Sequence, residues 1–150
     1  MTMTILRTTC VALVCASLGT VSAAQSPSFG NDSSDFANDG ECDDQRFIGN
    51  GMATSLSLEN IGKDASDCSA LFLDGQLKLV SESAGRAATQ CNKINFGDNT
   101  SDWINDGECD DARFGGRGMA SDLNWTNVFR DANDCRMACD AGTIWRRVGQ

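Results

Sequence analysis

Apolar residues are dense at the start of the chain and sparse in the rest of it. Residues 10–21 form a short run of Val, Leu and small residues, and the stretch before them carries Arg7 and no acid. The run ends in Val-Ser-Ala-Ala at residues 21–24, which places small residues where a signal peptidase reads. The run is too short to span a bilayer. A basic start, a short apolar run and small residues at its end are typical of a secretory leader, so residues 1–23 are predicted to be a signal peptide.

Behind this leader, helical spacing appears once in each half of the chain. Cys68, Leu71 and Phe72 fall three and four residues apart, on one face of a helix predicted for residues 64–75. The Asp at its first position is expected to cap the helix, and the Gly at its last position is expected to end it. Residues 131–142 repeat this arrangement.

The residues that precede the first helix predict turns. Residues 29–53 are rich in Gly, Asn and Asp, which favour turns, with short strands expected at 35–37 and 46–48. The small core is expected to combine the apolar face of each helix with the aromatic residues of the same half. These aromatic residues are Phe29, Phe36 and Phe47, and then Phe96, Trp103 and Phe114.

The two halves repeat one sequence. Residues 29–68 align with residues 96–135 without a gap, at a constant offset of 67, and 23 of the 40 aligned pairs are identical. The segment Asn-Asp-Gly-Glu-Cys-Asp-Asp occurs at 38–44 and again at 105–111. A repeat of this length indicates one structural unit used twice. The fold expected is therefore a small, disulfide-stabilised α+β tandem duplication, each copy with a turn-rich, short-strand front half and one short helix. The expected parts are a signal peptide (1–23), a first module (24–80), a loose linker (81–95) and a second module (96–150).

The cysteines predict a disulfide framework. Of the eight in the chain, two lie in the predicted leader and six remain. An even number in an exported chain is typical of disulfides. Each copy contains one equivalent pair, and the two cysteines without a counterpart in the first copy are expected to bond to each other. The predicted bonds are Cys42–Cys68, Cys109–Cys135 and Cys91–Cys139. A cross-link between the copies is the alternative.

The charge of the chain limits its partners. The 12 basic and 21 acidic residues give a formal charge of −9, and loss of the leader with its one Arg leaves 11 and 21, a charge of −10. Such a surface repels nucleic acid. It suits cations, a basic protein or a basic component of the cell envelope, and no membrane insertion is expected after signal cleavage. Residues 144–150 contain two Arg and are expected to be a basic tail. Because the chain has no His, the usual nucleophilic triads are excluded.

The repeated acidic segment is a candidate calcium site. Calcium takes six to eight oxygens from carboxylates, amides and carbonyls in a flexible shell. A Gly inside the segment permits a sharp turn around an ion, and the adjacent Cys would anchor that turn. The EF-hand pattern is not met, because aligning Gly40 with its glycine puts Ala37 and Arg46 at ligand positions. The predicted metal ligands are Asp35, Asn38, Asp39, Glu41, Asp43, Asp44, Asp102, Asn105, Asp106, Glu108, Asp110 and Asp111.

Two other functions are consistent with the same residues. The repeated acids would also serve to preserve a turn and an internal salt bridge with Arg46 or Arg113, in a metal-free interaction or structural module with an acidic face. Paired carboxylates hydrolyse glycosides in some enzymes, but two very small modules without a normal substrate cleft argue against an enzyme. We expect a non-enzymatic, calcium-binding module, with the metal-free module and a carboxylate-based hydrolase as alternatives.

The complete repeat pattern resembles a known one. Asn-Asp-Gly-Glu-Cys-Asp-Asp-x-Arg-Phe, followed by Gly-Met-Ala and Asp-Ala-x-Asp-Cys, resembles a repeat of exported bacterial proteins, mainly alphaproteobacterial, found alone or appended to protease-like domains. The resemblance covers residues 29–80 and 96–147. It implies a periplasmic or secreted accessory module and no established activity, so the functional expectation rests on the chemistry of the acidic segment.

Overall fold

The computed structural model describes residues 26–150, so the predicted signal peptide lies outside the described residues. They form a small α+β fold with three α-helices and three small sheets. None of these helices is long and apolar enough to cross a membrane. In chain order the elements are β1 (Phe47–Gly49), β2 (Ser55–Ser57), α1 (Ala65–Leu73), β3 (Leu77–Leu79), α2 (Glu82–Ala88), β4 (Cys109–Asp111), β5 (Phe114–Gly116), β6 (Met119–Asn124), α3 (Ala132–Asp140) and β7 (Ile144–Arg146).

The first half packs helix α1 against the hairpin of β1 and β3. These strands are antiparallel, with Phe47 opposite Leu79. The Phe47 ring is fully buried and has two aromatic neighbours, with its centroid 5.5 Å from that of Phe29 and 6.0 Å from that of Phe72. The predicted helix is present here, and of the predicted core aromatic residues of this half Phe29 and Phe47 pack together, with Phe72 of the helix.

The second half contains equivalent elements 67 residues later. Strands β5 and β7 pair with Phe114 opposite Arg146, and α3 occupies the positions that correspond to α1. Phe96 stacks on Phe114 at 5.6 Å. Cys139 stands where the first half has Phe72, and it packs in the same core.

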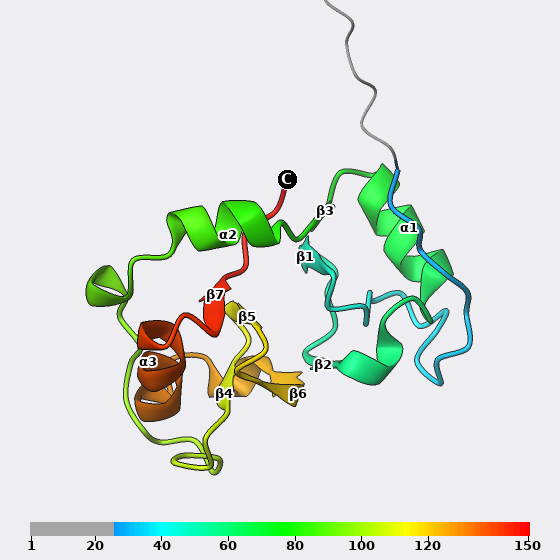
Figure 1. Ribbon diagram of the computed structural model, residues 1–150. Coiled ribbons are helices and arrows are strands. Elements are labelled where there is room, and N and C mark those ends of the chain that lie inside the picture. The colour runs from blue at the N-terminus through cyan, green and yellow to red at the C-terminus, as the bar shows by residue number, and fades with distance from the viewer. Residues whose placement is uncertain (1–25) are drawn as a thin grey trace, which may run out of the picture.

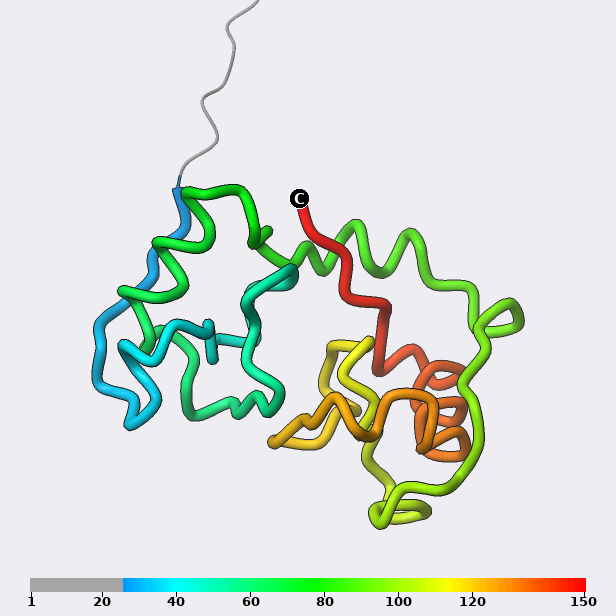
Figure 2. The backbone as a smooth tube through the Cα atoms, turned by 180° about the vertical axis from the view of Figure 1, so that it is seen from behind, coloured from blue at the N-terminus to red at the C-terminus, as the bar shows by residue number. Residues whose placement is uncertain are grey.

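The halves are joined along strands β2 and β6, which are antiparallel with Leu56 opposite Leu123. The C-terminal segment also connects the halves, because Gly149 bridges to Val80 after the chain leaves β7 (Figure 2). As Figure 1 shows, α1 and α3 lie at opposite ends of the molecule, with the paired strands between them.

All three predicted disulfides are formed, and together they use the six cysteines of residues 26–150: Cys42–Cys68, Cys91–Cys139 and Cys109–Cys135. Two of them tie the acidic segment of each half to the following helix. The third ties the 3-10 turn that precedes the second half to α3. A cross-link between the repeated pairs is therefore ruled out.

Several local expectations are wrong. Residues 35–37 form turns and not a strand, and residues 81–95 contain helix α2 and a 3-10 turn in place of a loose connector. Phe36 and Trp103 are 55% and 59% exposed, so they lie outside the core. The expected basic tail contains strand β7 and the buried Arg147. The Arg147 guanidinium donates hydrogen bonds to backbone carbonyls.

Candidate functional site

The repeated acidic segment forms a tight turn that enters a disulfide. Asn38 and Gly40 adopt positive φ angles of 69° and 96°, a region that Asn tolerates and Gly adopts freely. Asp39 closes the turn by accepting a hydrogen bond from the Glu41 amide at 3.0 Å. The second segment has the same turn, with positive φ at Asn105 and Gly107.

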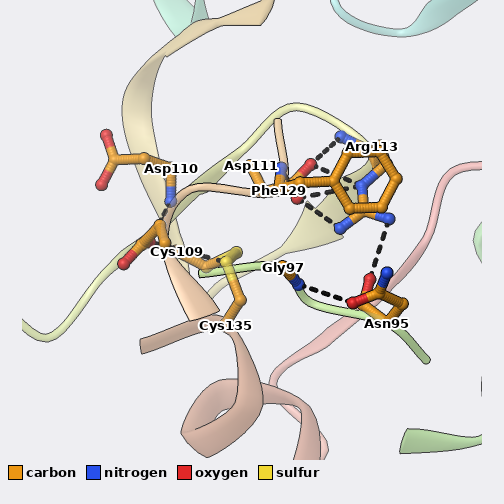
Figure 3. Close-up of polar contacts among 9 residues, drawn as sticks. Asn95, Gly97, Cys109, Asp110, Asp111, Arg113, Phe129 and Cys135 are labelled. Carbon is orange, nitrogen blue, oxygen red and sulfur yellow. Dashed lines mark hydrogen bonds and ion pairs between the residues drawn. A yellow bond between two sulfur atoms is a disulfide. The ribbon is translucent and has the colours of Figure 1, made fainter. Parts of the chain in front are cut away.

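The last acid of each segment has a structural role. Asp44 is 1% exposed and accepts hydrogen bonds from Arg46 Nε and Nη2 and from the Gly62 amide. Its equivalent Asp111 binds Arg113 and the Phe129 amide in the same way (Figure 3). Asp44 and Asp111 belong to the predicted metal ligands, and in this structure both oxygens of each accept hydrogen bonds from the neighbouring arginine. The internal salt bridge considered as an alternative exists at these two positions.

The preceding acid points to the other side of the chain, as Figure 3 shows for Asp110. In the first half, Asp43 is 4% exposed, and its amide donates to Asp64 Oδ2 at 2.7 Å. Asp64 is fully buried, and its side chain accepts no capping hydrogen bond from the first turn of α1, so it does not act as the expected cap. Asp43 Oδ2 and Asp64 Oδ1 have no hydrogen-bond partner within residues 26–150.

Further carboxylates surround this buried pair. Asp67, in the first turn of α1, accepts a hydrogen bond from the Asp39 amide at 3.0 Å. Burial raises the pKa of Asp43 to about 6, and the negative charges of Asp39 and Asp64 add to the effect. Burial likewise raises the pKa of Asp64 to about 6. We call this group the first acidic cluster: Asp39, Glu41, Asp43, Asp64 and Asp67.

The second acidic cluster consists of the equivalent residues: Asp106, Glu108, Asp110, Asp131 and Asp134. The Asp110 amide donates to Asp131 Oδ2 at 2.8 Å. Burial, with Asp106 and Asp131 nearby, raises the pKa of Asp110 to about 7, and burial raises the pKa of Asp131 to about 6. Asp110 Oδ2, Asp131 Oδ1 and Asp134 Oδ2 have no hydrogen-bond partner in the described part of the chain. Both clusters therefore contain buried carboxylate oxygens that no donor among residues 26–150 satisfies.

The disulfide sulfurs beside each cluster are not ligands. Asp64 lies within 4.8 Å of Cys42 and Cys68, a grouping that resembles a thiolate site. The two sulfurs are bonded to each other, so neither is available as a thiolate for zinc. The ligands that the clusters offer are carboxylate oxygens.

A cleft of about 740 Å³ lies between the two halves, and the acidic segments of both halves line it. Equivalent residues occupy its two sides, with the exposed rings of Phe36 and Trp103 also at its surface. No Lys or Arg of the described chain lines it. The carboxylates from the two acidic segments are Asp39, Glu41, Asp43, Asp106, Glu108 and Asp110.

The structure brings together part of the predicted ligand set. Asp35 and Asp102 are exposed and do not line the cleft, and Asn38 and Asn105 serve as turn residues. The acids that follow the segment in sequence were missed: Asp64 and Asp67, with Asp131 and Asp134. The signal that could have identified them is their identity in both halves, beside the second cysteine of each pair, although helix capping accounts for the same pattern.

The arrangement can hold a cation in each half and a positively charged ligand in the cleft. We compared the chain with protein-family models, with curated proteins and with solved structures, and none of them matches it.

Proposed function

We propose that this protein is an extracytoplasmic, disulfide-stabilised binding module built from two copies of one unit, and that each copy binds one calcium ion. The observation that supports this proposal is the pair of buried carboxylates in each cluster, Asp43 with Asp64 and Asp110 with Asp131. Each of these four residues has an oxygen without a partner among the described residues. An unpaired buried charge is costly, and a bound cation would offset that cost.

The chemistry of the clusters favours calcium among the common cations. Each cluster offers five carboxylates, which are the hard oxygen ligands that calcium prefers. The chain has no His, and its described cysteines are in disulfides, so the nitrogen and sulfur ligands typical of zinc are lacking. The acids come from a turn and from a helix start that a disulfide holds together, so the site is largely organised before an ion binds.

The proposed location follows from the cysteines and the predicted leader. Three disulfides are characteristic of an oxidising, extracytoplasmic environment. A leader at residues 1–23 directs the chain to the periplasm or the medium, where calcium is available. The resemblance to exported bacterial repeats agrees with this location.

The test is calcium binding by the oxidised mature protein. Calorimetry is expected to give two calcium ions per chain, and millimolar calcium is expected to raise the melting temperature above its value in chelator. Asp43→Asn combined with Asp110→Asn is expected to abolish both effects. At pH 8 in chelator the same variant is expected to melt above the parent, because a neutral amide replaces a buried unpaired charge.

The matched control is Asp44→Asn combined with Asp111→Asn. These residues are adjacent to the proposed ligands but are used in ion pairs. The control is expected to melt lower with and without calcium while it retains the calcium-dependent rise. An unchanged melting temperature of the parent at millimolar calcium rejects the calcium sites and favours a metal-free module with an acidic face.

A further inference from the structure

We infer that the two proposed calcium sites are unequal: the second half binds its ion first, with Asp134 as an additional ligand, and the first half binds its ion only at higher calcium. The inference rests on the proposed function and concerns the order in which the two sites fill. Both clusters have the same five carboxylates at equivalent positions, so the difference lies in the hydrogen bonds that those carboxylates make and in how firmly they are held.

The equivalent acids Asp67 and Asp134 have different surroundings. Asp67 is half-buried, and one of its oxygens already accepts a hydrogen bond from the Asp39 amide at 3.0 Å. Asp134 is only 3% exposed, and its Oδ2 has no hydrogen-bond partner among residues 26–150. In the described part of the chain, the second cluster therefore has three carboxylates with a buried, unpartnered oxygen, and the first cluster has two.

A sequence difference between the halves accounts for the free oxygen of Asp134. In each half the acidic turn is tied to the start of the following helix, and in the first half this tie uses a carboxylate of the cluster. In the second half Asn133 makes the tie, because its side-chain amide donates to Asn105 Oδ1 at 3.0 Å. The equivalent of Asn133 is Ser66, whose hydroxyl bonds elsewhere. A neutral side chain thus replaces a carboxylate in this role, and Asp134 keeps its oxygen for an ion.

The helix that carries Asp134 is also held more firmly. Helix α3 contains Cys135 and Cys139 and so takes part in two disulfides, whereas α1 contains Cys68 and takes part in one. Calcium affinity depends on the charge of the ligands and on the rigidity of the site. Because an unpaired buried charge is costly, the cluster with more such charges gains more when an ion binds. Both differences favour the second half.

The test is calorimetric titration of the oxidised mature protein with calcium at pH 8. Two steps of one ion per chain are expected, with dissociation constants that differ roughly tenfold or more. Amide NMR assigns the steps to the halves. The cross-peak of Gly107, in the second acidic turn, is expected to shift in the first step, and that of Gly40 in the second step. Shifts of both glycines together, or of Gly40 first, would overturn the inference.

The informative variant is Asn133→Ser, which gives the second half the residue of the first and removes no carboxylate. It is expected to weaken the tighter step roughly tenfold, because Asp134 then becomes the acceptor that ties the acidic turn. Asp134→Asn is expected to weaken the same step at least as much. The control is Asn92→Ser, the same change at an exposed position outside both clusters, which is expected to bind like the parent. If either of the other two variants binds calcium like this control, the inference is overturned.

The outcome is separable from that of the proposed function. Two calcium ions bound with one common affinity would support the calcium sites and overturn the order of filling. The absence of binding heat and of any shift of Gly40 and Gly107 at millimolar calcium would reject the calcium sites, and the inference with them.

Discussion

Leu56 and Leu123, which are 67 residues apart in the chain, lie directly opposite each other in the β2–β6 pair. Both are 2% exposed and belong to one apolar cluster. The contact between the halves is therefore made by the same residue from each side.

This pairing predicts equal effects of two distant substitutions. Leu56→Ala and Leu123→Ala are each expected to lower the free energy of unfolding by about 2–4 kcal/mol, since each leaves a cavity in the same cluster. Because the side chains share this cluster, the double variant is expected to depart from the sum by about 0.5 kcal/mol or more. Urea denaturation measures all three. Leu58→Ala, at a 54% exposed position, is the control and should change little.

Arg147 is expected to make a second contribution to stability at the contact between the two halves. Its guanidinium donates to the carbonyl of Ala112 at 3.1 Å and to those of Gln45 and Phe47 at 2.9 and 2.6 Å. Burial lowers its pKa to about 10, so it stays protonated at neutral pH. Arg147→Ala is expected to lower the free energy of unfolding by roughly 3 kcal/mol, because buried carbonyls lose a charged donor.

The control for this prediction is the neighbouring Arg146, which is exposed. Arg146→Ala is expected to stay within about 0.5 kcal/mol of the parent in urea denaturation. Equal losses in the two variants would mean that the buried hydrogen bonds at Arg147 contribute little to the junction.

The raised pKa values predict an unusual dependence of stability on pH. Asp43, Asp64 and Asp131 have pKa values of about 6 in the folded chain, and Asp110 about 7, against an ordinary value of 3.8. The folded state therefore binds these protons more tightly than the unfolded state. Their contribution to the free energy of unfolding is full below about pH 4 and is lost as the pH rises to about 7.

Urea denaturation in chelator from pH 4 to 8 measures this loss. Asp43→Asn combined with Asp110→Asn is expected to show a shallower decline, and calcium is expected to stabilise the parent most at the upper end, where the clusters are ionised. If the stability of the parent in chelator declines with pH no more steeply than that of the variant, the raised pKa values of the buried carboxylates are contradicted.

The third disulfide predicts a partial rescue. Removing Cys91–Cys139 with Cys91→Ala and Cys139→Ala opens a link of sequence separation 48 and is expected to cost about 4 kcal/mol on the chain-entropy estimate. Replacing Cys139→Ala by Cys139→Phe restores the residue type of Phe72, which packs edge-on against two rings in the first half. The variant with Cys139→Phe is expected to recover about 1 kcal/mol or more of the lost free energy of unfolding, as measured by thermal and urea unfolding.

The internal repeat was sufficient to predict the disulfides and the two equivalent helices. It favoured one pairing of the cysteines over a cross-link between the copies, because each copy contains an equivalent pair and the two cysteines without a counterpart are then left to bond to each other. Gly75 ends α1 with a φ of 74°, in agreement with its role in the sequence pattern. These features depend on local conformation or on the repeat itself, both of which can be read along the chain.

Tertiary features escaped prediction for physical reasons. Asp64 and Asp67 begin a helix, where acids favour the helix dipole and act as caps, so nothing local indicated that they face the acidic turn. Phe36 and Trp103 were assigned to the core by residue type, but the space beside Phe47 and Phe114 is filled by other side chains. Arg147 has Val80 as its first-half equivalent, so the repeat carried no signal for its buried position.

The β2–β6 contact has a consequence for how the two halves associate. A contact in which each side presents the same residue is self-complementary, as in a twofold-symmetric homodimer. In a chain with a single repeat, this strand edge could pair only with the same strand of a second molecule. Pairing would then depend on the protein concentration. Linking two repeats in one polypeptide replaces that encounter with an intramolecular one, and the two halves then need not be identical: the residues 67 positions before Cys91, Cys139 and Arg147 are Ala24, Phe72 and Val80.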